Sequence, residues 1–383
     1  MRKIKIFALV EGGIVDKLSD RISGTFIRIH YILKYSKQKE DIELIYIPFQ
    51  YKQKYSAYYS RINYLSDLFY HFAIPFLSWL IILFRRPDFV YFSYPNAVFN
   101  DKFNVPLLRF AKRTGARLLM YAHDWAEQLE IERRSTSEIL RWEKCERELV
   151  KMSDILVVVL SKYPEFETAV LHGGFEPEEF ANLRYRIYEN RFNIAYIGAM
   201  SQGIGLDLLV DSAIMLHKKY PYIRLFLFGK YSETAMLDEE TKNKIEQLEF
   251  ITHQVVPRTK LISHFSDVDV FAYVANPNIS YHNNTRRSKL FEYIGSEIPF
   301  IATQCVGLKV VSNGQGFLWV DYSADDFCQK LEYLLQNPQE RMRLSKELHR
   351  LKRGNTWQNR ADKLHDIIID YLCKQERPKD AKT

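Results

Sequence analysis

The stretch that decides the fold lies past the middle of the chain and reads FNIAYIG (192–198), LDLLVDSAIMLHKKY (206–220) and IRLFLFG (223–229). The outer two segments are short apolar runs that end in glycine, whereas the middle one has the length and composition of a helix. A strand, a helix and a second strand in this order indicate parallel strands joined by a crossover helix.

The same alternation runs through most of the sequence and divides it into two similar halves. In the first half the strand-like runs are KIKIFALV, IELIYIPF, DFVYFS, RLLMYAH and ILVVVL, with helix-like segments between them. The rhythm pauses in the polar segment GGFEPEEFANLRYRIYENRFN (173–193) and resumes with the stretch above, followed by FITHQ, DVFAYV and FIAT. We therefore expect an α/β protein with two wound domains and a linker between them.

Composition and charge limit the kinds of partner. The 383 residues are 47% hydrophobic, which fits a globular chain of two domains. Residues 1–175 hold 26 Lys and Arg against 20 Asp and Glu, a net +6, and the remainder holds 28 against 27, a net +1. Because no zinc-finger, helix-turn-helix or RNA-binding signature is present, the basic half predicts weak association with an anionic membrane surface and no nucleic acid. Four widely spaced cysteines without a CxxC pair favour a reducing cytoplasm and no metal cage.

One apolar run could be taken for a membrane segment. FAIPFLSWLIILF (72–84), followed by Arg85 and Arg86, has 13 residues, whereas a spanning helix needs roughly 17–25. Its length favours a buried helix, and the alternative is a helix that rests on the bilayer surface. The N-terminal MRKIKIFALVEGG lacks the cleavage pattern of a secretory signal and is expected to be the first strand.

Residues 285–302, TRRSKLFEYIGSEIPFIA, place cations where a helix should begin. The helix is indicated by an apolar stripe, followed by a glycine stop and a proline before the strand-like FIAT. Arg286, Arg287 and Lys289 then lie at its positive end, where each cation costs roughly 0.3–1 kcal/mol. Either these side chains extend into water, or they bind an anion. The cluster of three cations, with Glu292 three residues after Lys289 on the same face, favours a phosphate-bearing ligand here.

Other glycine and polar residues follow predicted strands. In open parallel sheets ligands bind beyond the carboxyl ends of the strands, and two facing sheets create a cleft between domains. The candidates at such ends are Gly24, His123, Asp124, Gly198, Gly203 and the cationic helix. We therefore expect one active site in the cleft between the two domains.

The order and spacing of these segments resemble the GT-B fold glycosyltransferases, specifically glycosyltransferase family four, the group one glycosyl transferases. The resemblance covers nearly the whole chain and is strongest from Asn193 to about Leu372. It is carried by YIGAMSQG with LDLLVDSAIMLHKKYPYIRLFLFG, SDVDVFAYV, SKLFEYIGSEIPFIAT, GFLWV and NPQERMRLS before Trp357. In the N-terminal half the Gly24 loop, YAHDW and SDILVVVLS ahead of HGGFEPEEF are similar but looser.

The resemblance implies two facing Rossmann-like domains, with residues 1–175 binding the acceptor and 193–356 binding the donor, joined by a linker at 176–192. Residues 357–373 are expected to form a helix that packs back on the N-terminal domain, and 374–383 a disordered tail. The implied activity is retaining transfer of a sugar from a nucleotide-sugar donor, a UDP-sugar, to a saccharide or lipid-linked acceptor in cell-surface polysaccharide or glycoconjugate synthesis. The implied location is the cytoplasm, peripheral on the inner face of the membrane.

The resemblance also implies roles for residues of the cationic helix. Ser288 and Lys289 would bind the diphosphate, which is the leaving group, and Glu292 would accept hydrogen bonds from the two ribose hydroxyls. His123 is expected against the donor sugar. Asp124 would be the base of an inverting reaction or the N-cap of the next helix, and we favour the cap.

The chain departs from the family pattern at three positions. The family carries an Arg and a Lys where this sequence has Ala199 and Gln202, and a glutamate where it has Asn284. The missing positive charge would have to come from neighbouring basic residues. The full set expected at the donor is Gly24, Gly198, Gln202, Gly203, Lys230, Val256, Asn284, Arg286, Arg287, Ser288, Lys289 and Glu292.

Several alternatives stay open from the sequence. Asp267 and Asp269 resemble a metal-binding carboxylate pair, but they precede a buried strand, so we expect no metal or other cofactor. The segment YKQKYSAYYSRINY (51–64) could form an aromatic and basic acceptor surface. The alternatives to an active transferase are a non-catalytic GT-B partner subunit, which the three departures favour, and a nucleotide-sugar epimerase.

Overall fold

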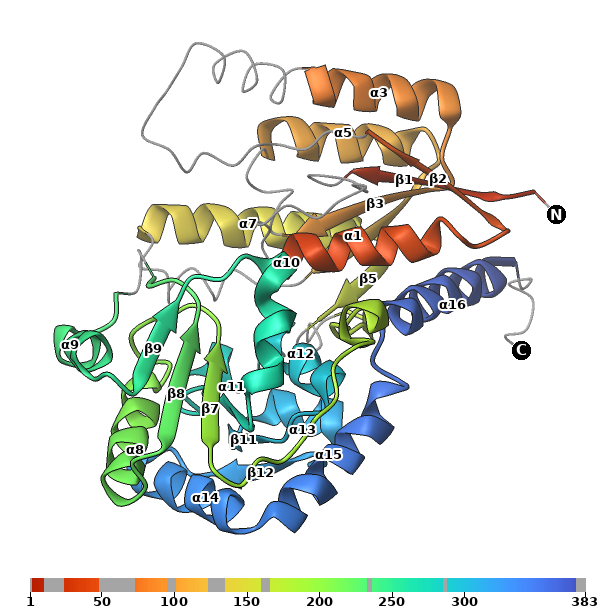
Figure 1. The fold of residues 1–383 in the computed structure, drawn as a ribbon. Helices are drawn as coiled ribbons and strands as arrows, with labels where there is room; N and C mark the ends of the chain where they lie inside the picture. The colour runs from red at the N-terminus through yellow and green to blue at the C-terminus, as the bar shows by residue number, and fades with distance from the viewer. Residues whose placement is uncertain are drawn as a thin grey trace, which may run out of the picture.

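The computed structural model describes residues 2–9, 24–47, 73–94, 101–122, 135–159, 166–232, 236–284 and 288–376, and only the backbone at 24–26, 101–102 and 280–281. Within these residues the chain forms two six-stranded parallel sheets with helices packed against them (Figure 1). The predicted α/β class with two Rossmann-like domains is therefore confirmed.

The first sheet has the strand order β2-β1-β3-β4-β5-β6, and all its neighbouring strands are parallel. Alternate residues of these apolar strands face opposite sides, so each side of the sheet has its own cluster of buried side chains. Its strands are β1 (Ile4–Leu9), β2 (Ile42–Tyr46), β3 (Phe89–Tyr94), β4 (Arg117–Ala122), β5 (Ile155–Val158) and β6 (Thr168–Val170). Its helices are α1 (Gly24–Ser36), α3 (Ile74–Arg85), α5 (Asp101–Arg113) and α7 (Thr136–Met152).

The second sheet has the order β12-β11-β10-β7-β8-β9, so the chain reverses direction across the sheet between β7 and β10. Its strands are β7 (Phe192–Ile197), β8 (Ile223–Phe228), β9 (Ile251–Gln254), β10 (Val270–Tyr273), β11 (Phe300–Thr303) and β12 (Phe317–Val320). The helices are α8 (Leu206–Lys219), α9 (Glu239–Gln247), α10 (Arg258–Leu261), η3 (Ile262–Asp267), α11 (Ser280–Asn284), α12 (Ser288–Ser296), α13 (Val306–Ser312), α14 (Ala324–Gln336) and α15 (Pro338–Lys352). The arrowheads of β7, β8 and β9 point toward the half that holds α1 (Figure 1).

The chain passes between the two halves twice, and the two crossings are hydrogen-bonded to each other. The amide of Phe175, just before η2 (Pro177–Phe180), donates to the carbonyl of Asn355 at 3.2 Å, and the amide of Trp357 donates to the carbonyl of Phe175 at 3.1 Å. After the second crossing, α16 (Trp357–Glu376) packs along α1 of the first half (Figure 1).

The end of α16 corrects the predicted tail. Lys374 to Glu376 continue the helix instead of starting a disordered segment, and the Lys374 ammonium lies 3.4 Å from a carboxylate oxygen of Glu167. The rest of the predicted tail lies outside the described residues.

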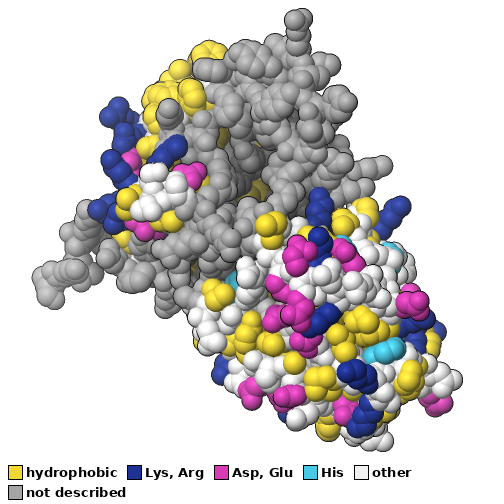
Figure 2. Space-filling model, turned by 90° about the vertical axis from the view of Figure 1, so that its left-hand side faces the viewer, with side chains coloured by type: hydrophobic (Ala, Val, Ile, Leu, Met, Phe, Trp, Pro, Cys, Tyr) yellow, Lys and Arg dark blue, Asp and Glu magenta, His cyan; other side chains and the backbone are white. Residues whose placement is uncertain are grey.

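Helix α3 corrects the expectation of a buried helix for residues 72–84. Pro75, Ser78 and Ile82 face the protein, but Phe76 is 63% exposed and Phe84 75% exposed. Hydropathy alone could not separate these two faces, because both are apolar. Helix α3 lies at the top of the molecule in Figure 1, and hydrophobic side chains gather at the same height in Figure 2. Among the described residues, no helix combines the length and the hydropathy that crossing a membrane requires.

Candidate functional site

Two loops at the carboxyl edge of the second sheet are in direct backbone contact. The amide of Gly198, after β7, donates to the carbonyl of Phe228 at 2.9 Å, and the amide of Met200 donates to the carbonyl of Lys230 at 2.8 Å. A Cβ on Gly229 would lie 1.9 Å from the carbonyl oxygen of Gly198, so only glycine fits there. Because the loops are joined, Lys230 is held beside the loop that begins at Gly198.

Lys289, in the first turn of α12, is a buried cation at the same edge. It is only 5% exposed, and its ammonium lies 4.0 Å from the ring centroid of Tyr196 and 5.3 Å from that of Tyr273. These rings come from β7 and β10, between which the sheet reverses, and aromatic faces attract cations. A Cβ on Gly198 would be 3.4 Å from the ammonium. The structure thus brings Lys289, Gly198 and the reversal point together.

Glu292 lies one turn further along the same helix. Its side chain is 13% exposed, and one carboxylate oxygen lies 3.4 Å from Nε of Arg258, at the start of α10. Burial raises the pKa of the Glu292 carboxyl; Arg258 and Lys289 lower it, and the carboxylate of Glu179 raises it. The carboxylate is therefore positioned among charged groups from several elements.

The remaining predicted donor residues lie in loops and at helix ends. Ser288 is the first residue of α12, and Val256 precedes Arg258 by two positions in the segment after β9. Gln202 and Gly203 are exposed in the loop between β7 and α8, where Gly203 has a φ of +76°, and Asn284 ends α11. Gly24 is the first residue of α1 and belongs to the other half.

Some predicted site residues cannot be placed. His123, Asp124, Arg286, Arg287 and the segment 51–64 lie outside the described residues. Their expected roles stay predictions.

Arg258 and Glu179 were missed by the sequence analysis. Nη2 of Arg258 donates to a carboxylate oxygen of Glu179 at 2.7 Å, and the same guanidinium approaches Glu292. One signal was available, because Arg258 is another cation at the start of a helix that follows a strand. Its partners, however, lie 79 and 34 residues away along the chain.

The Asp267 and Asp269 pair lies at the opposite end of the sheet. Asp269 is fully buried before β10, where its carboxylate accepts the amide of Asn193 at 2.9 Å and lies 3.6 Å from Arg191 and 3.7 Å from Arg341. Burial raises the pKa of Asp269 to about 6, and these neighbours act in the opposite direction. The amide and the two cations already surround the Asp269 carboxylate, which fits a structural ion cluster instead of a metal ligand.

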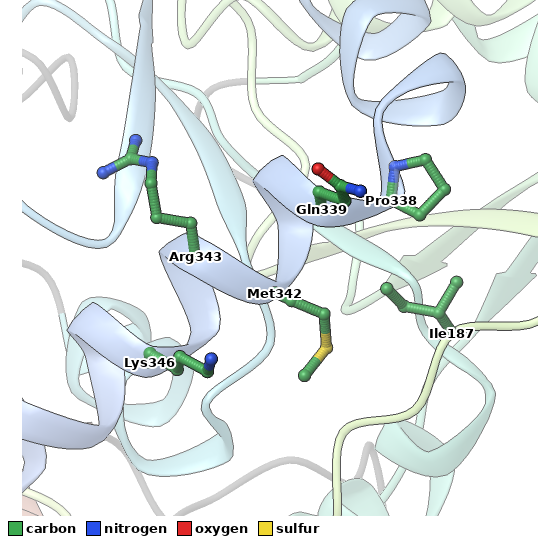
Figure 3. A pocket seen from close by; sticks show the side chains of 6 residues that line it. All are labelled: Ile187, Pro338, Gln339, Met342, Arg343 and Lys346. Atoms are coloured by element: carbon green, nitrogen blue, oxygen red, sulfur yellow. The ribbon is translucent and has the colours of Figure 1, made fainter.

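A shallow pocket elsewhere on the second half is lined by none of the predicted residues. It lies between α15 and the segment before β7, where Met342 extends toward Ile187 while Arg343 points the other way (Figure 3). Arg343 is paired with Glu340 and Glu347. The Arg343 guanidinium is therefore already neutralised by two carboxylates, and the pocket does not present it to a phosphate.

Comparison with known proteins finds a family match in the second half. Residues 191–337 match the family model described as Glycosyl transferases group 1. This segment contains the whole second sheet together with Lys289, Glu292 and Arg258. No curated protein shows significant sequence similarity to the chain.

Solved structures share the fold over nearly the whole chain at low identity. Anabaena Alr3699/HepE in complex with UDP-glucose has a TM-score of 0.63 and 11% identity, over 96% of this chain and 100% of that one. A glycosyltransferase from Rickettsia africae ESF-5 has a TM-score of 0.60 and 15% identity, over 97% and 99%. An alpha,alpha-trehalose-phosphate synthase (UDP-forming) from Burkholderia xenovorans in complex with glucose-6-phosphate has a TM-score of 0.60 and 13% identity, over 95% and 100%.

These findings confirm the resemblance stated from the sequence. The match of residues 191–337 to a glycosyltransferase family model confirms the expected enzyme class, a glycosyltransferase. The solved structures confirm the GT-B fold over nearly the whole chain.

Proposed function

We propose that the protein transfers a sugar from a UDP-sugar to a saccharide or lipid-linked acceptor in the synthesis of a cell-surface polysaccharide or glycoconjugate. The observation that carries this proposal is the pair formed by the buried Lys289 ammonium and the Glu292 carboxylate, one turn apart on α12 at the edge where β7 and β10 end. A nucleoside diphosphate offers an anion and, nearby, two ribose hydroxyls. The pair is complementary to both.

The electrostatics suit a reaction in which a diphosphate leaves. As the bond between the sugar and the diphosphate breaks, negative charge develops on the diphosphate, and a fixed buried cation such as Lys289 stabilises it without reorganisation. Lys230, on the adjoining loop, and Arg286 and Arg287, next to α12, would supply the charge that the family takes from the positions of Ala199 and Gln202.

The solved relatives support the donor class. The HepE structure contains UDP-glucose and the trehalose-phosphate synthase structure contains glucose-6-phosphate. We extend the class of donor and acceptor to this chain without choosing the sugar. Retention of configuration, with His123 beside the donor sugar and Asp124 capping the next helix, is part of the proposal.

The exposed face of α3 supports a location at a membrane surface. Phe76, Leu77, Leu83 and Phe84 are all exposed along this helix, and Arg86 follows it, also exposed. An apolar face beside basic residues is the arrangement by which a helix lies in a bilayer interface. Such docking on the inner face of the membrane would bring the acceptor side of the enzyme to a lipid-linked sugar.

Slow hydrolysis of nucleotide sugars tests the proposed reaction, because it needs no acceptor. The protein is incubated with UDP-, GDP- and ADP-sugars, and the released nucleotide is measured with and without excess EDTA. We expect release from at least one UDP-sugar at a rate that EDTA does not change, because fixed cations take the place of a divalent ion.

Two results would contradict this proposal in different ways. Loss of hydrolysis with EDTA and recovery with Mg²⁺ or Mn²⁺ would show that the reaction needs a metal. UDP binding without hydrolysis of any donor would favour the non-catalytic partner subunit, which the departures at Ala199, Gln202 and Asn284 make the second candidate.

A further inference from the structure

Arg258 lies between two carboxylates that come from distant parts of the chain. Its Nη2 donates to Glu179 at 2.7 Å and its Nε lies 3.4 Å from Glu292. The three side chains are 15%, 25% and 13% exposed, so water screens them only in part. Nε of Arg258 is fully buried and, among the described residues, Glu292 is the acidic group facing it.

The contacts continue from Glu179 into the other half of the molecule. The hydroxyl of Tyr31, on α1, donates to the second carboxylate oxygen of Glu179 at 3.1 Å. The Tyr31 ring stacks on Trp357 at a centroid distance of 5.9 Å, which fixes it against α16. An unbroken series of polar contacts therefore runs from α12 through α10 and η2 to α1.

We propose that Arg258 is a positioning residue that keeps Glu292 oriented and ionised for the ribose of the donor, and that Glu179 and Tyr31 transmit occupancy of this site to α1. The inference rests on the proposed function, because that function assigns Glu292 to the ribose. Arg258 itself acts through Glu292.

The balance of charge around Glu292 explains why it needs Arg258. Among the described residues, the charged groups that face it are Lys289 from its own helix, Arg258 from α10 and Glu179 from η2. Helix α15 also packs on α12, but its His349 and Lys352 pair with Glu297, beyond the far end of α12.

Removal of the guanidinium would leave two carboxylates close together in a partly dry site. Like charges in such a site disfavour ionisation, so one carboxyl takes up a proton. A protonated carboxyl is a poorer acceptor for two ribose hydroxyls than a carboxylate. Binding of UDP should therefore fall at neutral pH and recover as rising pH ionises Glu292 again.

The test is the affinity for UDP by calorimetry between pH 6 and pH 9, expressed as the ratio of variant to wild type at each pH, so that ionisation of UDP itself cancels. Arg258→Met is expected to lose about tenfold or more at pH 7, the equivalent of one charged hydrogen bond, and to recover in part by pH 9. Arg258→Lys keeps the charge and should lose less, with a nearly flat ratio. Lys260→Met, which removes an exposed cation from the same helix, is the control and should match wild type.

Glu179→Gln should change the pH dependence of UDP binding in the opposite direction to Arg258→Met. It removes the second carboxylate but keeps an oxygen that accepts from Arg258, so its affinity ratio should rise toward low pH. Tyr31→Phe keeps the ring and removes only the hydroxyl. We expect that UDP slows amide hydrogen exchange in α1 of the wild type and that this protection is lost in Tyr31→Phe.

The outcomes separate this inference from the proposed function. If wild type binds UDP and Glu292→Gln weakens it, but Arg258→Met keeps wild-type affinity at every pH, Arg258 does not position Glu292. Unchanged protection of α1 in Tyr31→Phe overturns the transmission to α1. If wild type does not bind UDP, or Glu292→Gln binds it normally, the assignment of the donor site fails instead.

Discussion

The two halves share a sheet architecture but differ in what their helices bury. Each has six parallel strands. In each sheet the chain reverses direction beside its first strand, between β1 and β3 in the first half and between β7 and β10 in the second. In the second half, α12 buries a lysine and holds a glutamate that is nearly buried, whereas in the first half α3 exposes phenylalanines. The net charge differs as well, +6 for residues 1–175 and +1 for residues 176–383. We propose that similar frameworks have been adapted in the second half to a small anionic ligand and in the first half to a surface.

The largest effect is expected at Gly229 of the second half, where the backbone leaves no space for a side chain. Gly229→Ala would place a methyl group 1.9 Å from the Gly198 carbonyl, so the two loops must separate. We expect the free energy of unfolding to fall by about 3 kcal/mol, at the upper end of overpacking costs, and UDP binding to be lost. Chemical denaturation and calorimetry measure the two effects. Gly354→Ala, whose Cβ would meet nothing within 4 Å, is the control, and equal stability of the two variants would contradict the rigid-loop description.

A smaller effect is expected from the charged pair on α12. Lys289→Ala and Glu292→Ala should each weaken UDP binding by about 1.5–3 kcal/mol, the value of a hydrogen bond to a charged group, while the fold is retained. Lys218→Ala and Glu249→Ala remove exposed charges of the same kinds from the same half and should bind UDP normally. Wild-type affinity of both α12 variants by calorimetry would show that α12 of the second half does not bind the nucleotide.

The smallest effect is expected at the membrane surface. Wild type should float with anionic vesicles at low salt, because each basic residue near such a surface contributes about 1 kcal/mol over a Debye length of roughly 10 Å at 0.1 M salt. Phe76→Ser with Phe84→Ser should reduce the floated fraction. Val306→Ser with Val310→Ser, exposed apolar residues on α13 of the second half, should not. Equal flotation on neutral vesicles, or association that survives high salt, would show that this surface does not dock electrostatically.

The sequence predicted the framework well because the framework depends on local pattern. Continuous apolar runs between helix-like segments located ten of the twelve described strands. The exceptions are β6 (Thr168–Val170) and β12 (Phe317–Val320), whose GFLWV segment contributed only to the family resemblance. The position of Lys289 and Glu292 could also be anticipated, because cations at a helix start and a carboxylate one turn later are visible within eight residues.

What could not be predicted depends on contacts between distant segments. Arg258 acquires its meaning only when Glu179 and Glu292 are brought to it, and no local pattern announces that meeting. Likewise the two faces of α3 are equally apolar, so only packing decides that Ile82 is buried and Phe84 is exposed.

The return of α16 to the first half has a consequence for synthesis on the ribosome. Trp357, Leu364 and Ile368 complete the same buried cluster as Ile29, Ile32 and Tyr91, although more than 260 residues separate the two groups. When the first half leaves the exit tunnel, the face of its sheet on which α1 packs therefore lacks the cover of α16, and it stays so while the whole second half is translated. Nascent-chain aggregation, and the help of a chaperone to prevent it, would be concentrated in that interval.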